Sequence, residues 1–470
     1  MSNFSRREFL KKSLAGGTAI TLMGSTSKVT VLSSSHLPEV DWQAPEPMVE
    51  RVVSDEWVPP KGTEEVAAAL ERPLKVYNMG DLKFDPATVK NAEIFGERTG
   101  IEVEHIPVSA PVALAKETTV LSSRSPEPVM MHVGSEYYLN FVEPGWLEPT
   151  CEIWDEPTLK HFPPAYKQDL MTDIDATRDV NCIYGASYYS GLQMVHWRTD
   201  VLKEVGLNPE DYHRPTWDDI LEIGEALEGT NRFACSINGL PLRNAAHWLV
   251  QEIFAQGGNI WQDGKLIFNS PEGVAAIEFL QELVEKRYVP NPATTNETDV
   301  STGFLAGKSV SALHGTNIIA QAKDEIGLEN YNLTTSFTPN TGSNPNPASL
   351  LATMMICINT WSPEIKKLAA KIYCDFRRSR ESLVREFATE TNTPAIDVAL
   401  DDPVNAEGPY ADYIPTIKAG LDNAIAGLYP RLSSIGDKIG KELGSVYSGD
   451  ASAKEALDNA QEFVDATLGQ

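Results

Sequence analysis

The stretch that decides the fold is LKVYNMGDLKFDPATVKNAEIFGERTGIEVEHIPV, residues 74–108. Residues 74–78 form a short apolar run typical of a buried strand. Residues 86–99 carry apolar side chains at helical spacing and end at Gly100, and glycine commonly closes helices. Residues 101–108 alternate between apolar and polar side chains, as a second strand does. The order predicts a strand–helix–strand unit with two parallel strands in one sheet.

The same alternation of strands and helices continues along the chain. A helix at residues 112–123 leads to a short apolar strand at 128–133, and Thr216 precedes two acidic residues as the N-cap of a further helix. The expected later elements are strands at 191–197 and 310–313, helices at 216–227, 247–256 and 271–286, a loop at 331–349, and a helical region at 417–468. A parallel sheet covered by helices is therefore the predicted architecture.

Length and composition limit the class of protein. At about 100–200 residues per domain, 470 residues predict about two to four domains. Hydrophobic residues make up 42% and charged residues 22%, which excludes wholesale disorder and a polytopic membrane protein. The 66 acidic residues outnumber the 39 basic ones, and the net charge of −27 repels nucleic acid. The excess of acid fits either a salty habitat or a need for solubility.

The cysteines exclude several metal and redox sites. No C-x-x-C motif occurs, which removes zinc ribbons, thioredoxin-like sites and common iron–sulfur runs. Cys357 and Cys374 lie in apolar or amphipathic patterns and are expected to be core thiols. The best disulfide candidate is Cys151 with Cys182, because both lie in the first half of a chain that is expected to be exported.

The N-terminus carries an export pattern. Residues 5–11, SRREFLK, resemble a twin-arginine signal, and residues 14–23 form a weakly apolar segment too short to span a bilayer comfortably. No clean cleavage site follows, so both a cleaved and a retained signal stay open. Residues 33–62 mix proline and acid without periodicity, which predicts a flexible linker. The alternative is a surface strap packed through Trp42 and Trp57.

Five segments, in order, resemble the extracytoplasmic solute-binding proteins of ABC importers, in the sugar-binding family that includes maltose-binding protein. The first two contain YNMGD with FGERTGIEV and VMMHVGSEY with EPGWLEP; the third is YGASYYSG, the fourth DVLKEVGL with RPTWDDI, and the fifth FLAGKSV with HG. They lie at residues 77–103, 129–149, 184–191, 200–220 and 304–315. The resemblance extends over nearly all of residues 74–470.

The resemblance implies an α/β fold of the type II periplasmic binding protein class, with two α/β lobes joined by a hinge. It implies an N-terminal lobe of residues 74–187 and 348–395 and a C-terminal lobe of residues 188–347 and 396–470. These follow a signal region at 1–32 and a linker at 33–73. The lobes would rotate about strands near residues 187–190 and 347–353.

The resemblance also implies binding rather than catalysis, so no catalytic residue, cofactor or metal is expected. The chain would capture a sugar or oligosaccharide and deliver it to the membrane permease of an ABC importer. It would act as a monomer in the periplasm or at the cell surface. Residues that can hold hydroxyls or stack on sugar rings are expected to bind the ligand. They are Asn78, Asp81, Ser135, Glu136, Tyr137, Tyr189, Asn238, Arg243, His247, Trp248, Asn317 and Tyr429.

Each of these residues also has an ordinary structural role open to it. Asp81 suits a helix cap, His247 a structural hydrogen bonder, and Arg243 a partner for one of the many acids. Trp248 and Tyr429 suit the core or the packing of a lobe. The chain also departs from the family's pattern, since Thr316-Asn317 stand where sugar binders often place an aromatic residue and Trp197-Arg198 replace the usual Tyr-Asn pair.

Three other functions are alternatives. A phosphorylated polyol is one possible ligand, with Arg243 supplying a charge-assisted fork. Tyr188-Tyr189 are similar to the paired tyrosines of ferric-ion binders, although sugar binders also carry aromatic residues there. A secreted carbohydrate-active enzyme is less favoured, because no G-x-G-x-x-G, G-x-S-x-G or H-E-x-x-H motif occurs. It stays an alternative because 66 acidic residues guarantee that some carboxylate pairs arise by chance.

Overall fold

The computed structural model describes residues 37–43, 48–80, 82–154, 156–166, 183–335, 337, 348–426, 429 and 431–470. The chain divides into two units, Met1–Leu37 and Pro38–Gln470, and the second is the body described below. The twin-arginine pattern lies outside the described residues.

The first part of the sheet confirms the predicted strand–helix–strand unit. Strands β1 (Leu74–Met79) and β2 (Val103–Val108) are parallel and are joined by α4 (Pro86–Thr99), and Gly100 closes that helix in the left-handed conformation with φ 72°. Helix α5 (Ala110–Ser122) leads to β3 (Met130–Gly134), which pairs in parallel with β1.

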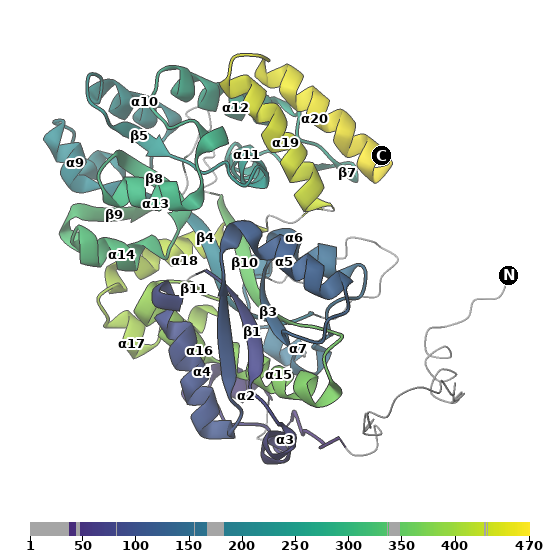
Figure 1. Cartoon of the computed structure of the whole chain (residues 1–470). Helices are drawn as coiled ribbons and strands as arrows, with labels where there is room; N and C mark the ends of the chain where they lie inside the picture. The colour runs from purple at the N-terminus through teal and green to yellow at the C-terminus, as the bar shows by residue number, and fades with distance from the viewer. Residues whose placement is uncertain are drawn as a thin grey trace. The chain divides into compact units, whose positions relative to one another are not determined.

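Two long strands connect this part of the sheet to the rest. The strand order is β2-β1-β3-β10-β4-β8-β5, and β4 (Ala186–Arg198) and β10 (Ser349–Ile358) run antiparallel in its middle. The first part of β4 pairs with β10, and residues from Gln193 onward pair with β8 instead. The two segments about which the lobes are expected to rotate, near residues 187–190 and 347–353, lie in or at the start of these strands, which we call the crossover strands. Figure 1 shows them running along the middle of the body.

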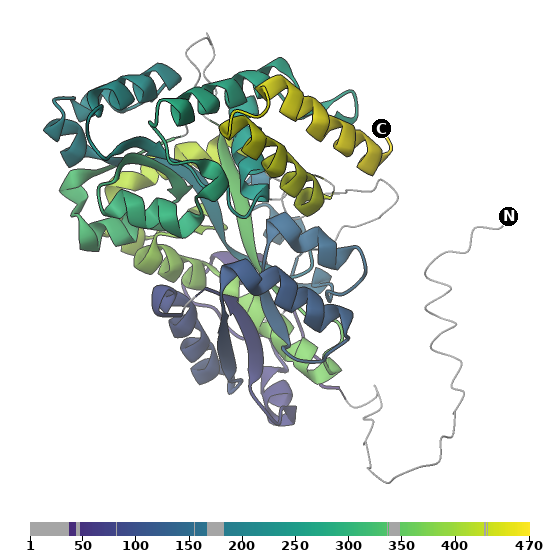
Figure 2. The same ribbon diagram turned by 45° about the horizontal axis from the view of Figure 1, so that its top comes forward.

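The second part of the sheet is again parallel. Strand β5 (Phe233–Ser236) pairs with β8 (Ser309–Gly315), and helices surround them (Figure 2). The predicted N-cap of α10 (Trp217–Ala226) is confirmed, because the Thr216 hydroxyl accepts from the Asp219 backbone while the Asp219 carboxylate accepts from Thr216. Helices α11 (Arg243–Ala255), α12 (Pro271–Glu285), α19 (Leu432–Tyr447) and α20 (Ala453–Leu468) complete this part.

The remaining helices and strands are mostly short. Strand β9 (Tyr331–Thr334) occupies the beginning of the stretch predicted as a loop, because it finds a partner in the distant β4. Strand β12 (Ala424–Ala426) interrupts the predicted C-terminal helical region by pairing with β10. The other elements are α2 (Met48–Val53), α3 (Thr63–Ala69), α6 (Ser135–Val142), α7 (Glu156–Leu159), α9 (Thr199–Glu204), α13 (Glu297–Leu305), α14 (Ile318–Glu325), α15 (Glu364–Arg377), α16 (Arg380–Glu390), α17 (Pro403–Ala406), α18 (Ile414–Asp422), β6 (Trp261–Gln262), β7 (Lys265–Leu266) and β11 (Thr393–Pro394).

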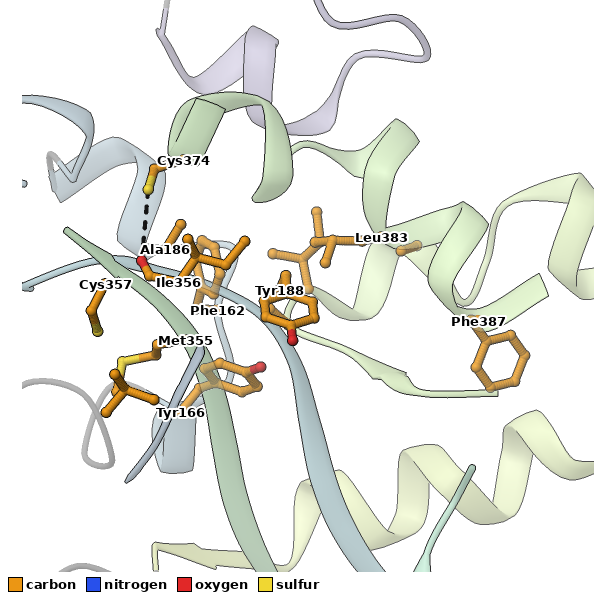
Figure 3. Packing of buried hydrophobic residues seen from close by; sticks show 14 of the residues in the cluster. Phe162, Tyr166, Ala186, Tyr188, Met355, Ile356, Cys357, Cys374, Leu383 and Phe387 are labelled. Carbon is orange, nitrogen blue, oxygen red and sulfur yellow. Dashed lines mark hydrogen bonds between the residues drawn. The ribbon is translucent and has the colours of Figure 1, made fainter. Parts of the chain in front are cut away.

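The buried apolar side chains form two clusters, which we call the first and second cores. The first core surrounds β1, β3 and parts of β4 and β10 and includes residues of α6, α15 and α16; it also extends to α13, β8, α14 and β9, so it does not coincide with one predicted lobe. Figure 3 shows Tyr166, Tyr188 and Met355 packed there. The second core lies among β5, β8 and helices α10, α11, α12, α19 and α20. Two cores joined by two strands form the two-lobed α/β fold, whereas the residue limits of the lobes stay a prediction.

Residues 48–73, part of the predicted linker, pack against the body as a strap. Trp57 is 1% exposed, and its indole Nε1 donates a 2.9 Å hydrogen bond to Asp375 of α15. Arg51 forms a 2.8 Å ion pair with the same carboxylate. Burial alone would raise the pKa of Asp375, but Arg378 and Arg51 hold it below its usual value. Trp57 is buried as the alternative to a flexible linker expected, and Trp42 is partly buried against the same core.

The cysteines fall into two groups. Cys235, Cys357 and Cys374 are free and buried, which confirms the expected core thiols, and the Cys374 thiol contacts the Ile356 carbonyl at 3.6 Å (Figure 3). Cys151 is disulfide-bonded. Cys182 lies outside the described residues, so their pairing stays a prediction. Among the described helices, none has the length and apolar character to span a bilayer.

Candidate functional site

Helix α6 carries three of the predicted site residues at the end of β3. The strand gives way directly to the helix at Ser135, whose hydroxyl oxygen accepts the Thr353 backbone N–H at 3.1 Å. This bond ties the start of α6 to β10, the second crossover strand. Tyr137 is 2% exposed, and Glu136 keeps 18% of its side chain exposed. The sheet therefore holds Glu136 at a fixed place beside the crossover.

Helix α11 brings Arg243 to Glu136 from the other core. Arg243 Nη2 lies 3.8 Å from Glu136 Oε1, and its guanidinium carbon lies 6.0 Å from the centroid of the Tyr137 ring. The elements that hold the two partners belong to different cores. This ion pair and the contact of Arg243 with Tyr137 join predicted site residues that are held by helices of different cores.

Glycine at position 436 brings Tyr429 beside Arg243. A Cβ added to Gly436 of α19 would lie 2.9 Å from the Arg243 Cβ and 3.3 Å from the Tyr429 hydroxyl. The Tyr429 ring is fully buried, with its centroid 5.3 Å from that of Phe268. The absence of a side chain at Gly436 thus lets the base of the Arg243 side chain and the Tyr429 hydroxyl lie close to α19 at one corner.

Burial determines the charge of the groups around this corner. It raises the pKa of Glu136, while Arg243 opposes the rise. Burial, with a smaller contribution from Arg243, lowers the pKa of His247 to about 4. His247 is therefore neutral at pH 7, and it lies one helical turn after Arg243 on α11, where residues four apart share a face. A neutral imidazole offers one donor and one acceptor.

Several donors of the predicted site residues are buried without a hydrogen-bond partner. Within the part of the chain that the structure describes, Arg243 Nε, Trp248 Nε1 and the Tyr429 hydroxyl have none. Leaving a buried donor unpaired costs about 1–3 kcal/mol. A polar solute that hydrogen-bonds such groups recovers that free energy, so these groups favour a polyhydroxylated solute over an apolar one.

Four other predicted residues make no contact with Arg243 in the part of the chain that the structure describes. Asn78 is fully buried on β1, where its amide donates to Asp85 at 3.1 Å and its oxygen lies 3.2 Å from His105 Nδ1. Tyr189 packs edge-on against Tyr188 with ring centroids 4.9 Å apart. Across the described residues, no hydrogen bond, ion pair or ring contact links Arg243 to Asn78, Tyr189, Asn238 or Asn317. Asp81 lies outside the described residues.

Glu117 is a neighbour that the sequence did not single out. This residue of α5 is 1% exposed, and its Oε2 has no partner among the described residues. Burial, assisted by the charge of Glu136, raises its pKa to about 9, against the effect of a hydrogen bond with Tyr137. Glu117 is thus an uncharged acid at pH 7. The one sequence signal for Glu117 is its position on the apolar side of a helical pattern, where an acidic residue is unusual.

A second acidic group lies elsewhere in the first core. Carboxylate oxygens of Asp85, Glu386 and Glu390 all lie within 4.8 Å of one another. Arg377 pairs with Glu386 at 2.6 Å, and the Ala87 backbone N–H donates to Glu390 at 2.7 Å. Asp85, which is partly buried, and Glu390 accept hydrogen bonds from neutral donors and Glu386 pairs with Arg377, so protein groups already serve this acidic group.

Comparisons with known proteins agree with this fold. The sequence profile of the family described as bacterial extracellular solute-binding protein matches residues 90–411. A lactose-binding protein from Rhizobium radiobacter is 30% identical over 167 residues, covering 34% of this chain and 36% of the relative. An arabinooligosaccharide-binding protein from Bacillus subtilis (strain 168) is 25% identical over 129 residues, covering 26% and 28%.

A solved structure extends the comparison to most of the chain. Maltose-bound MalE3 from T. maritima superposes with a TM-score of 0.74 at 18% identity, covering 84% of this chain and 99% of that one. This similarity supports the fold, whereas the chain spans only about a third of the length of the curated relatives. The family profile covers more than half of the sequence, and the protein therefore belongs to the bacterial extracellular solute-binding protein family.

Proposed function

We propose that this protein captures a neutral sugar or oligosaccharide between its two lobes and delivers it to the permease of an ABC importer. The observation that carries the proposal is the meeting of Glu136 and Arg243 at 3.8 Å, from helices that belong to different cores. A solute held there contacts both lobes only when they are together. Its binding free energy then favours the closed form.

The chemistry of the corner suits hydroxyl groups. Each sugar hydroxyl donates one hydrogen bond and accepts others, and this corner supplies the Glu136 carboxylate, the Arg243 guanidinium and the neutral imidazole of His247. The Tyr137 ring lies beside Arg243 and the Tyr429 hydroxyl beside Gly436, and both rings are buried in this form of the protein. Sugar sites combine such planar polar groups with ring faces.

The charge balance favours a neutral solute over a phosphorylated polyol. Arg243, the cation that would grip a phosphate, already faces the Glu136 carboxylate. A phosphate beside Arg243 would also lie close to that carboxylate, and like charges at short range repel. A sugar without charge meets no such cost.

The relatives support the solute class without fixing its size. The curated ones bind lactose and arabinooligosaccharides, and the superposed structure holds maltose. As a member of an extracellular family, the protein works in the periplasm or at the cell surface. Export by the twin-arginine route rests on residues 5–11, and a monomeric state is part of the same proposal.

A thermal-shift screen tests the proposal. Neutral mono- and oligosaccharides are each paired with a charged counterpart, a uronic acid or a phosphate ester. A ligand that binds the native state raises the melting temperature by mass action, so at least one neutral sugar is expected to do so while its charged counterpart does not. If only phosphate esters raise the melting temperature, the ligand is a phosphorylated polyol and not a neutral sugar. Turnover of an oligosaccharide in the same mixtures would reveal an enzyme instead.

A further inference from the structure

One face of α6 touches the second lobe beyond the proposed solute site. Glu136, Asn140 and the C-cap residue Glu143 recur at i, i+4 and i+7, which places them on one side of the helix. Leu139 of the same helix packs against residues of both cores. Helix α6 therefore contacts residues of both cores at several positions along one face.

The start of α19 receives this face. Asn140 Nδ2 donates to the Ser433 hydroxyl at 3.1 Å, and that hydroxyl donates to the Glu136 carbonyl at 3.3 Å. Arg431 Nη1 lies 3.8 Å from Glu143 Oε2. Arg431 has φ 56°, a left-handed conformation that is unfavourable for a residue with a Cβ. Arg431 and Ser433, which contact Glu143 and Asn140 of α6, thus lie two positions apart at the start of α19.

The helix ends themselves favour this arrangement. The N-terminus of α19, a helix of 16 residues, carries partial positive charge and free backbone N–H groups, and a carboxylate nearby is stabilised by it. Glu143 supplies that carboxylate from the other lobe. All of these contacts are between protein groups, so they hold α6 against the start of α19 whether or not a solute is bound.

We propose that Asn140 and Glu143 of α6, with Arg431 and Ser433 at the start of α19, form an electrostatic latch that biases the two lobes toward closure independently of the solute. The latch is weak because Arg431 keeps 61% and Glu143 30% of the side chain exposed. Exposed ion pairs are screened by salt. The latch therefore sets the ratio of open to closed protein and makes it dependent on ionic strength.

Single-molecule energy transfer on the full chain without added sugar measures this ratio. Dyes go on cysteines introduced at Lys90 of α4 and Lys454 of α20, and the free cysteines Cys235, Cys357 and Cys374 are buried. Glu143→Gln or Arg431→Gln is expected to lower the closed-to-open ratio by about two- to fivefold, the range that an exposed pair supports. One molar salt should lower the ratio of the unchanged protein by a similar factor and that of either variant by less.

A charge swap and a matched control complete the test. Glu143→Arg combined with Arg431→Glu should restore closure that either change alone removes. Lys438→Gln removes a charge from the same helix, but its partner Glu442 also lies on α19, so the ratio should stay unchanged. Equal ratios in all variants, or a loss in Lys438→Gln as large as in Arg431→Gln, would overturn the latch. Because no sugar is added, failure of the sugar proposal would leave this measurement unaffected.

Discussion

Replacing Trp57 tests whether the strap is a structural part of the first lobe. The side chain is 1% exposed, its ring centroid lies 5.1 Å from that of Phe376 and 6.0 Å from that of Phe95, and its indole N–H donates to Asp375. Truncating a buried Trp to Ala costs about 3–5 kcal/mol. Losing a hydrogen bond to a charged acceptor costs about 1.5–3 kcal/mol. We therefore expect Trp57→Ala, which loses both, to destabilise the protein by at least about 4.5 kcal/mol, and Trp57→Phe, which keeps a ring and loses the hydrogen bond, by about 1.5–3 kcal/mol.

Urea unfolding followed by circular dichroism measures both changes. Trp261→Ala is the matched control, because that tryptophan is 38% exposed on the short strand β6, and its loss should cost less than about 1 kcal/mol. If Trp57→Ala unfolds at the same urea concentration as the unchanged protein, the strap is dispensable and residues 48–73 act as a linker after all. A loss no larger than that of Trp261→Ala would carry the same meaning.

Three further predictions concern the buried acid Glu117, the corner at Gly436 and the disulfide of Cys151. The pKa of Glu117 is raised to about 9, so the stability that its protonated form contributes is fully present below about pH 4.5 and is lost as the pH rises to about 9. Between pH 6 and 8 the free energy of unfolding therefore falls with pH, and Glu117→Gln should reduce that slope by about 1 kcal/mol per pH unit in chemical denaturation. An unchanged slope would refute the assignment. Gly436→Ala should weaken sugar binding at least tenfold in calorimetric titration, since its methyl group would meet Arg243 and the Tyr429 hydroxyl, and full affinity would show that this corner is not used. Cys151→Ser should lower the free energy of unfolding by about 2–4 kcal/mol under oxidising conditions, and equal stability with and without reductant in the unchanged protein would contradict a structural disulfide.

The parts of the fold that depend on local pattern could be predicted from the sequence. Helix α4 runs over Pro86–Thr99, the predicted limits, because its apolar spacing and Gly100 are both local signals. Strand β9 was missed because its four residues are strand only through pairing with β4. For a similar reason the sequence does not decide whether Trp57 is buried, since its partner Asp375 lies 318 positions away.

The candidate site shows the same division. The sequence indicates which residue types suit a ligand, but contacts between distant elements decide which of them meet. Arg243 pairs with an acid, the structural role that the sequence left open for it, and that acid is another predicted site residue, Glu136. Asn78 suited a ligand by position, yet Asp85 and His105 take both ends of its amide. No pattern along the chain could reveal these partners, because each comes from a different element.

Calorimetric titration of the best sugar from the screen against Glu136→Gln and Arg243→Met tests most directly whether one solute is held by both lobes. The account predicts a single site per chain, with affinity at least tenfold weaker in each variant, although the two residues belong to helices of different cores. Unchanged affinity in both variants, or a loss in only one of them, would contradict it.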